Sequence, residues 1–333
     1  MKIVAIGDPH IKSDNVVEFS LFEERLHNLL DEVKPDFVVV LGDVLHHHEK
    51  LYTTSLNNAT SFIKKIGDKY KTFVLVGNHD MINNQQFLTE NHWMNSIKLW
   101  GENIVIIDKV VRYQDFILCP YVSPGRFEEA LNTIGNWKNA SLIFAHQEFK
   151  GCKMGAIISE HGDTWDESLP MVVSGHIHLN QWVGKNVYYP GSALQHAFGE
   201  SERNTIPIIT KNKQWDITEK DLDLPRKKII TVNIEKAEKI EIQDDKKDQI
   251  KLSVTGDIHE FKSFKKSEKY KSLVDKGIKV VFKPKEIKNV DSVSQGEIQP
   301  FDTVLRELIL KEKDNDLLEI YERFVNNRDI IIL

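Results

Sequence analysis

Residues 73–80 read Phe-Val-Leu-Val-Gly-Asn-His-Asp, a short apolar run that changes abruptly to glycine and polar residues. A β-branched apolar run of this length, ended by glycine, predicts a buried strand. Aspartate, asparagine and neutral imidazole are the usual side-chain ligands of Mn²⁺, Fe²⁺ and Zn²⁺, so the end of this strand is a candidate metal site. The same pattern recurs, because apolar runs also precede Asp8, Asp43, His146 and residues 175–178.

The spacing of these motifs predicts how the strands are connected. Asp8, Asp43 and Asn78 are each 35 residues apart, enough for one strand, one helix and two loops. Apolar residues at helical spacing predict helices over residues 19–33 and 53–69. Right-handed crossovers of this kind make the strands parallel, and the loops after parallel strands gather at the carboxyl edge of a sheet. We therefore expect an α/β fold that brings the polar motifs together at one edge.

The pattern changes past about residue 200, which predicts a second, smaller domain. Residues 206–209 read as the last strand of the main domain, and residues 221–225 as a turn or linker. Three further strands are predicted over residues 229–234, 250–254 and 278–282, with one lysine-rich helix over residues 261–274. We expect a main domain over residues 1–222, a small α+β capping domain over 226–285, a linker over 286–300 and C-terminal helices over 301–333.

The charge of the chain is unevenly distributed. The whole chain carries a formal charge of −6, but residues 227–288 hold 17 lysines against 11 acidic residues, which leaves about −12 on the remainder. A basic segment on an acidic body favours a polyanion or protein partner, although solvated lysine-rich faces are common. The two cysteines form no short-spaced motif, and no run approaches the roughly 18 apolar residues of a membrane span. We expect a soluble, intracellular protein of the cytoplasm or nucleoid, with a phage or bacterium as candidate source.

Taken together, the polar motifs resemble a known family. The pattern D-x-H, G-D, G-N-H-D, H and G-H-x-H, in this order, resembles the calcineurin-like metallophosphoesterases over roughly residues 1–210. Within that superfamily, Gly-Asp-Val-Leu-His at 42–46, Ala-His-Gln at 145–147 and Tyr-Pro-Gly-Ser at 189–192 are similar to the Mre11/SbcD nuclease family, including phage recombination nuclease subunits. Pro9 and the Ile-Lys pair at 11–12 depart from that pattern.

The resemblance implies a core of β-sandwich type with flanking helices and two divalent metal ions, with Mn²⁺ preferred and Fe²⁺ or Mg²⁺ as alternatives. It assigns one metal to Asp8, His10 and His178, the second to Asn78, His146 and His176, and a bridging role to Asp43. His79 is the candidate to stabilise the transition state or protonate the leaving oxygen, with Asp80 either orienting it or capping the following segment. His46 is a second catalytic candidate, in contact with the phosphate or the scissile strand.

The remaining histidines are expected to play no direct part. His47 and His48 are predicted to be solvent-exposed neighbours of the site, and His196 lies near it. A lone histidine is more often a satisfied structural residue than a ligand, and this interpretation is applied to His27, His92, His161 and His259.

The function implied by the resemblance is a Mn²⁺-dependent DNA nuclease in double-strand-break processing or recombination. Its activities would be 3′→5′ exonuclease on duplex DNA and endonuclease on single strands. The C-terminal helices would bind a Rad50/SbcC-like ATPase, with the chain as a homodimer within a heterotetramer, and the phosphates of DNA would meet Lys262, Lys265, Lys266 and Lys269. The alternatives are a stand-alone phosphoesterase acting on nucleotides or phosphoproteins, and a metal-poor scaffold on the same fold.

Overall fold

The structure is a computed structural model. It describes residues 1–284, except Glu49 and residues 243–247, and eight helical residues nearer the C-terminus at 305–306, 309–311, 317–318 and 321. Met1–Pro284 form one compact unit and Lys285–Leu333 another. The predicted linker and most of the predicted C-terminal helices therefore lie outside the described residues. In the described part of the chain, no helix has both the length and the apolar character needed to cross a membrane.

The first of two large sheets carries the β-α-β-α-β pattern predicted from the sequence. Its strand order is β14-β13-β1-β2-β3-β4. The four strands β1–β4, of which β4 forms one edge of the sheet, are parallel. They span Lys2–Ile6, Phe37–Val40, Lys71–Leu75 and Ile104–Ile107. The crossover helices are α1, Val16–Val33, and α2, Thr53–Gly67. Two antiparallel strands, β13 (Thr205–Lys211) and β14 (Trp215–Asp221), complete the sheet, so residues 206–209 are not its last strand.

The second sheet has the order β11-β12-β10-β7-β6-β5. Its strands are β5 Val111–Tyr113, β6 Phe116–Leu118, β7 Leu142–His146, β10 Met171–Gly175, β11 Gln181–Val183 and β12 Val187–Tyr189. The short helix α3, Phe127–Asn132, lies along it, and β8 (Lys153–Met154) and β9 (Ile157–Ile158) form a separate hairpin. Strands β6, β7, β10 and β12 are mutually parallel, so this sheet also has a shared carboxyl edge.

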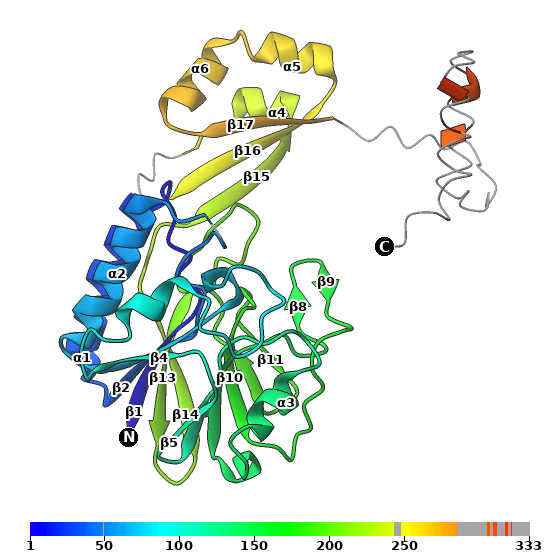
Figure 1. Ribbon diagram of the computed structural model, residues 1–333. Coiled ribbons are helices and arrows are strands. Elements are labelled where there is room, and N and C mark those ends of the chain that lie inside the picture. The colour runs from blue at the N-terminus through cyan, green and yellow to red at the C-terminus, as the bar shows by residue number, and fades with distance from the viewer. Residues whose placement is uncertain are drawn as a thin grey trace. The chain divides into compact units, whose positions relative to one another are not determined.

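The core shows that the two sheets are stacked face to face. One cluster of buried residues joins Val39 and Phe73 of the first sheet to Phe116 and Phe144 of the second. A second cluster packs α1 and α2 on the outer face of the first sheet, and a third packs α3 on the second. Figure 1 shows the helices on opposite sides of the paired sheets. This arrangement confirms the predicted α/β fold with a β-sandwich core and flanking helices.

Residues 227–284 form a smaller layer of sheet and helices, the capping layer, which has a core of its own. Strands β15 (Lys227–Asn233), β16 (Gln249–Gly256) and β17 (Lys279–Pro284) are parallel, and helices α4 (Ile234–Lys239), α5 (Ile258–Phe264) and α6 (Glu268–Asp275) complete the layer. The single helix predicted over residues 261–274 is wrong. Ser267 breaks it, because its hydroxyl accepts the backbone N–H of Tyr270 and caps α6 as a new helix.

Gly42 lies where the two sheets approach each other closely at the carboxyl edge. Its φ is +106°, and a Cβ built there would lie 2.5 Å from Nδ1 of His146. We expect Gly42→Ala to lower the free energy of unfolding by about 2 kcal/mol more than Gly125→Ala does. Gly125 is a matched control, since its φ is +85° but a Cβ there meets nothing within 4 Å. Urea unfolding of both variants measures the difference, and equal losses would contradict the clash.

Candidate metal centre

The predicted ligands all follow the carboxyl ends of parallel strands from the two sheets. The loops after β1, β2 and β3 carry Asp8 and His10, Asp43, and Asn78; β7 ends in His146, and β10 leads into His176 and His178. Four of these residues adopt left-handed backbone conformations, with φ of 33° at Asp8, 43° at His10, 50° at Asp43 and 79° at His176. Such conformations are costly for residues other than glycine, and they gather at functional sites where the surrounding fold enforces them.

One half of the centre is formed by Asn78, His146 and His176. Oδ1 of Asn78 lies 3.0 Å from Nε2 of His146 and 2.8 Å from Nδ1 of His176. Nδ1 of His146 donates to the carbonyl oxygen of Leu41 at 2.7 Å, which leaves its Nε2 directed at the asparagine oxygen. Two atoms that both carry lone pairs face each other here, so a proton or a metal ion between them is needed for a favourable contact.

The other half is formed by Asp8, His10 and His178. Nε2 of His10 lies 2.9 Å from Nε2 of His178, again two ring nitrogens in direct contact. Oδ1 of Asp8 accepts the backbone N–H of His176 at 3.0 Å, whereas its Oδ2 is buried and has no hydrogen-bond partner. A buried carboxylate oxygen without a partner is costly in a low-dielectric interior unless a cation binds it.

Asp43 stands between the halves and is shared by them. Its Oδ2 lies 3.3 Å from Nε2 of His146 and 3.6 Å from Nε2 of His10. Its Oδ1 accepts the backbone N–H of His79 at 2.8 Å, which fixes the orientation of the carboxylate. Asp43 belongs to two groups of residues whose ligand atoms all lie within 4.8 Å of one another. One group also contains His146 and His176, and the other contains Asp8 and His10. These donors fit two divalent ions that share one carboxylate.

The electrostatics of the cluster favour positive charge at its centre. Burial alone would lower the pKa of His146, but the carboxylates of Asp43 and Asp8 and the carbonyl of Leu41 together outweigh burial and raise this pKa to about 9. Burial lowers the pKa of His176 to about 3 and that of His10 well below its usual range, so both rings are neutral. His146 therefore keeps its proton up to alkaline pH, which shows that the centre favours positive charge. His176 and His10 are already neutral, which is the protonation state that metal ligands require.

Two residues outside the ligand set support the half formed by Asp8, His10 and His178. Nδ1 of His178 donates to the carboxylate of Glu200 at 3.3 Å, which leaves Nε2 of His178 directed at His10. Nε2 of His196 donates to the backbone carbonyl of Asp8 at 2.9 Å, and its ring packs edge-on against His10. Carboxylate and carbonyl partners of this kind fix the tautomer and orientation of ligating groups. The contact between Glu200 and His178 joins residues 22 positions apart, and it was not predicted from the sequence.

The segment that carries these supports is joined to the capping layer. The side chain of Gln195 donates to the carbonyl oxygens of Glu200 (3.1 Å) and Lys227 (3.2 Å) and accepts the backbone N–H of Lys227 at 2.6 Å. Nζ of Lys227 also bonds Glu18 of α1 at 2.9 Å. The first strand of the capping layer is therefore fastened to the loop behind the metal ligands, a connection that no sequence pattern suggested.

His79 lies at the rim of the centre, next to both halves of the ligand set. Its Nδ1 donates to the carbonyl oxygen of His46 at 2.6 Å, so its Nε2 is available. Its ring stacks on His46 (centroids 5.8 Å apart, 13°) and on His48 (4.4 Å, 18°), and meets His10 edge-on. His47 is exposed, as predicted, but His48 is half-buried against His79, which corrects the expectation that it is a solvent-exposed neighbour.

The structure corrects the role expected for Asp80 as the partner of His79. Its carboxylate accepts the backbone N–H groups of Val44 (3.1 Å) and Gly77 (3.1 Å) and the indole N–H of Trp93 (2.8 Å). The imidazole of His79 is oriented by a backbone carbonyl instead. Asp80 thus joins the loops after β2 and β3, a structural role that fixes the backbone on both sides of the metal ligands.

The buried position of Asp80 predicts a pH-dependent stability. Burial, together with the nearby Asp43 carboxylate, raises the pKa of Asp80 to about 6, against about 3.9 in an unfolded chain. When the folded chain has the higher pKa, the group stabilises the fold at pH values below the pKa of the unfolded chain. This stabilisation is lost as the pH rises from the unfolded pKa to the folded pKa. Between pH 4 and 6, metal-free wild type should therefore lose on the order of 3 kcal/mol relative to Asp80→Asn. Denaturant unfolding in EDTA at several pH values tests this, and parallel profiles would contradict it.

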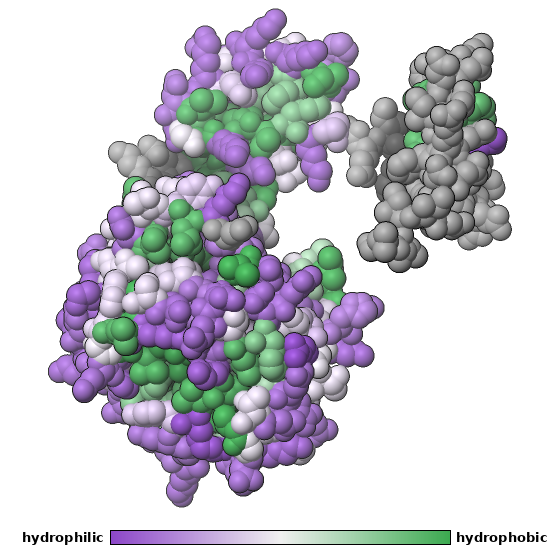
Figure 2. Space-filling model, viewed as in Figure 1, coloured by the Kyte–Doolittle hydropathy of each residue, from purple (hydrophilic) through white to green (hydrophobic). Residues whose placement is uncertain are grey.

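The four lysines proposed to contact DNA lie on the capping layer. Lys262 is in α5, Lys265 and Lys266 follow it, and Lys269 is in α6. The first three are exposed and Lys269 is half-buried. Figure 2 shows hydrophilic side chains around these helices. Elsewhere His92 is buried and paired with Asp108 at 3.2 Å, which matches the structural interpretation given to it.

Comparison with known proteins shows which family the chain resembles and which relatives it has. The model of the calcineurin-like phosphoesterase family matches residues 1–180. The provisionally named phosphoesterase 078R of Invertebrate iridescent virus 3 is 43% identical over 98% of this chain and 96% of its own length. The provisionally named phosphoesterase 244L of Invertebrate iridescent virus 6 is 46% identical over 80% of this chain and 98% of its own.

Two solved structures show weaker similarity. The nuclease MPE of Pseudomonas putida is 14% identical, covers 62% of this chain and 83% of its own, and has a TM-score of 0.32. The phosphoesterase Yfce of E. coli is 13% identical, covers 63% and 88%, and has a TM-score of 0.31.

Proposed function

The chain belongs to the calcineurin-like phosphoesterase family, and from this membership we propose that it is a Mn²⁺-preferring two-metal nuclease for DNA. Phosphoester hydrolysis with divalent metals is the activity of the family. Our proposal adds 3′→5′ exonuclease action on duplex DNA and endonuclease action on single strands, in double-strand-break processing or recombination. The observation that best supports the chemistry is the buried ligand cluster, whose two halves share Asp43.

In this proposal one metal ion is held by Asp8, His10 and His178. The other is held by Asn78, His146 and His176, and Asp43 contributes to both. When bound, the ions supply a water of lowered pKa and neutralise charge on the phosphate oxygens. The protein's own contribution is to hold each ligand in one orientation. The Leu41 carbonyl fixes the ring of His146, and Glu200 fixes the ring of His178.

Residues at the rim provide the remaining chemistry. In the proposal, His79 donates a proton from Nε2 to the leaving 3′-oxygen; its ring meets His10 edge-on, and its Nδ1 is bonded to the carbonyl oxygen of His46. Burial lowers the pKa of His79, so its ring is neutral in the free site. A bound phosphodiester brings negative charge next to it and favours the protonated form. His46, stacked beside His79, would contact the phosphate.

Hydrolysis of defined substrates tests the proposal. Metal-stripped protein supplied with Mn²⁺ should shorten a labelled linear duplex from its 3′ ends and cleave circular single-stranded DNA. Neither reaction should occur in EDTA. Hydrolysis of p-nitrophenyl phosphate with both DNA substrates left intact would instead support the alternative, a stand-alone phosphoesterase acting on nucleotides or phosphoproteins. The same assays with Mg²⁺ and Fe²⁺ test the preference for Mn²⁺.

The proposed partner is a Rad50/SbcC-like ATPase bound through residues 301–333. Deleting these residues should abolish co-purification with such an ATPase while basal Mn²⁺-dependent hydrolysis persists. Retained association would overturn this part of the proposal. Light scattering on the full chain, alone and with the ATPase, tests the proposed homodimer and heterotetramer.

A further inference from the structure

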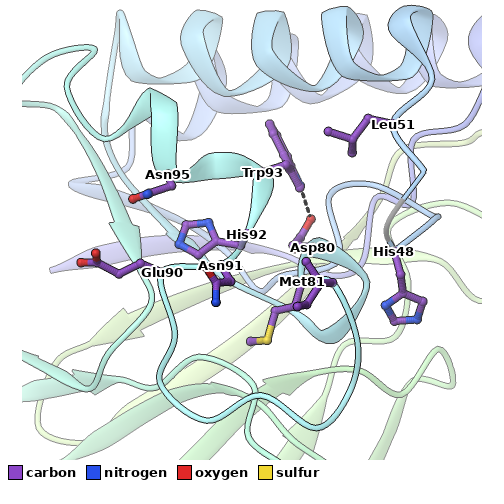
Figure 3. A pocket seen from close by; sticks show the side chains of 10 residues that line it. His48, Leu51, Asp80, Met81, Glu90, Asn91, His92, Trp93 and Asn95 are labelled. Carbon is purple, nitrogen blue, oxygen red and sulfur yellow. Dashed lines mark hydrogen bonds between the residues drawn. The ribbon is translucent and has the colours of Figure 1, made fainter.

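A cavity of about 490 Å³ opens beside the metal centre, and no role in metal binding accounts for it. Its lining comes from three segments: the loop at His48 and Leu51, the turn that ends in Asp80, and the loop and 3-10 helix that carry Asn91 and Trp93. Figure 3 shows these side chains arranged around the opening. The volume is in the range of pockets that bind small organic ligands.

The inner wall of the cavity is fixed in place. Trp93 donates its indole N–H to Oδ1 of Asp80 at 2.8 Å, the contact drawn in Figure 3. Asp80 is anchored in turn by the backbone N–H groups of Val44 and Gly77. Because this wall is tied to the same loops that carry the metal ligands, the cavity keeps a fixed position relative to the metal centre.

The chemistry of the lining disfavours a phosphate and fits a heterocyclic base. No lysine or arginine is among the described residues that line the cavity, and Glu90 adds negative charge. Leu51, which is 47% exposed, and Trp93 supply apolar and aromatic surface. The exposed side-chain amides of Asn91 and Asn95 form no hydrogen bond with another described residue. A flat, neutral ring with donors and acceptors on its edge satisfies both kinds of surface.

The cavity adjoins the residue proposed to act on the leaving oxygen. His48 lines the cavity and stacks on His79 with ring centroids 4.4 Å apart. A group attached through the leaving oxygen of a phosphodiester held at the metal centre would therefore extend into this space. In a nucleic acid that group is a nucleoside, and its base can enter a pocket only when it is unpaired and unstacked.

We propose that this cavity is a nucleobase subsite that binds an unpaired base next to the scissile phosphate. The inference rests on the proposed phosphodiesterase function. It narrows the substrates of the enzyme to single-stranded DNA and to duplex ends that have frayed. Base pairing in a duplex competes with the cavity, so frayed or mismatched termini should be cleaved faster than closed ones.

Two matched variants test the subsite. Leu51→Glu places a negative charge at the mouth of the cavity. Leu99→Glu adds the same charge at a side chain that is 93% exposed and does not line it. The substrates are thymidylyl-thymidine and the same dinucleotide lacking the base on the leaving side. For wild type and Leu99→Glu, removal of that base should raise KM about tenfold, or roughly 1.4 kcal/mol. For Leu51→Glu the intact dinucleotide should already show the raised KM, with no further effect of base removal.

A binding measurement separates this inference from the proposed function. Saturation-transfer NMR on metal-free protein should detect thymidine with wild type and Leu99→Glu, but not with Leu51→Glu. Thymidine binding without any diester hydrolysis would reject the nuclease proposal and keep the base pocket. Diester hydrolysis with unchanged thymidine binding in Leu51→Glu, or with equal KM for the intact and base-free substrates, would overturn the subsite.

Discussion

Replacing Asp43 with asparagine should remove metal binding and reduce hydrolysis at least about 10³-fold, a loss of roughly 4 kcal/mol in transition-state stabilisation. The amide oxygen of asparagine can still accept the backbone N–H of His79, which Oδ1 of Asp43 accepts at 2.8 Å. Its NH₂ group then occupies the position of Oδ2, which faces Nε2 of both His10 and His146. An amide nitrogen does not ligate a metal, so one substitution weakens both halves of the centre.

The measurement is metal content after dialysis against Mn²⁺, together with hydrolysis of bis-p-nitrophenyl phosphate. Asp14→Asn is the matched control, because that carboxylate is close in sequence to the ligands but 78% exposed. We expect the control to keep full metal content and activity. Two bound ions in Asp43→Asn would contradict the shared carboxylate, even with reduced activity.

The parts of this site that the sequence predicts are those that follow directly from strand ends. Asp8, Asp43 and Asn78 come immediately after buried apolar runs, and parallel pairing of β1, β2 and β3 places their loops at one edge. The strand-to-loop transition is a local pattern, so it is visible without the fold. The same reasoning located β7 and β10, whose ends bring His146 and His176 to the cluster.

The contacts that sequence reasoning missed join residues far apart in the chain. Asp80 bonds the backbone N–H groups of Val44 and Leu45, and Gln195 bonds Lys227. Backbone groups have no sequence signature, so nothing in the local pattern indicates which of them a side chain will meet. The missed strand β14 has a related cause. It is an edge strand whose residues alternate between exposed and half-buried, and it lacks the continuous apolar run that marks the central strands.

Two glycines allow the loops that carry the ligands to pack closely against one another. A Cβ built on Gly77 would lie 2.2 Å from Oδ1 of Asp43, and one built on Gly175 would lie 2.7 Å from the carbonyl oxygen of Leu41. Glycine therefore lets the loops after β2, β3 and β10 approach closely enough to share ligands. Because these loops pack so closely, the stacked sheets fix the backbone positions of the ligands.

His79→Ala should lower kcat by about 10²–10⁴-fold while both metal ions stay bound. His79 reaches the cluster through ring contacts only, and the hydrogen bond to Asp43 comes from its backbone N–H, which alanine retains. A proton donor matters most when the leaving oxygen is a poor leaving group. The loss should therefore be large for an alkyl leaving group, as in a dinucleotide, and small for p-nitrophenolate.

The exposed neighbour His47 provides the control, and His47→Ala should match wild type on both substrates. If His79→Ala lost the same factor with either leaving group, His79 would stabilise charge on the phosphate instead of protonating the departing oxygen. If metal content fell as well, the residue would belong to the ligand set. The ratio of the two kcat values thus separates three roles that are open to one imidazole, because the ring of His79 meets the ligand His10 edge-on and its Nδ1 is already bonded to the carbonyl oxygen of His46.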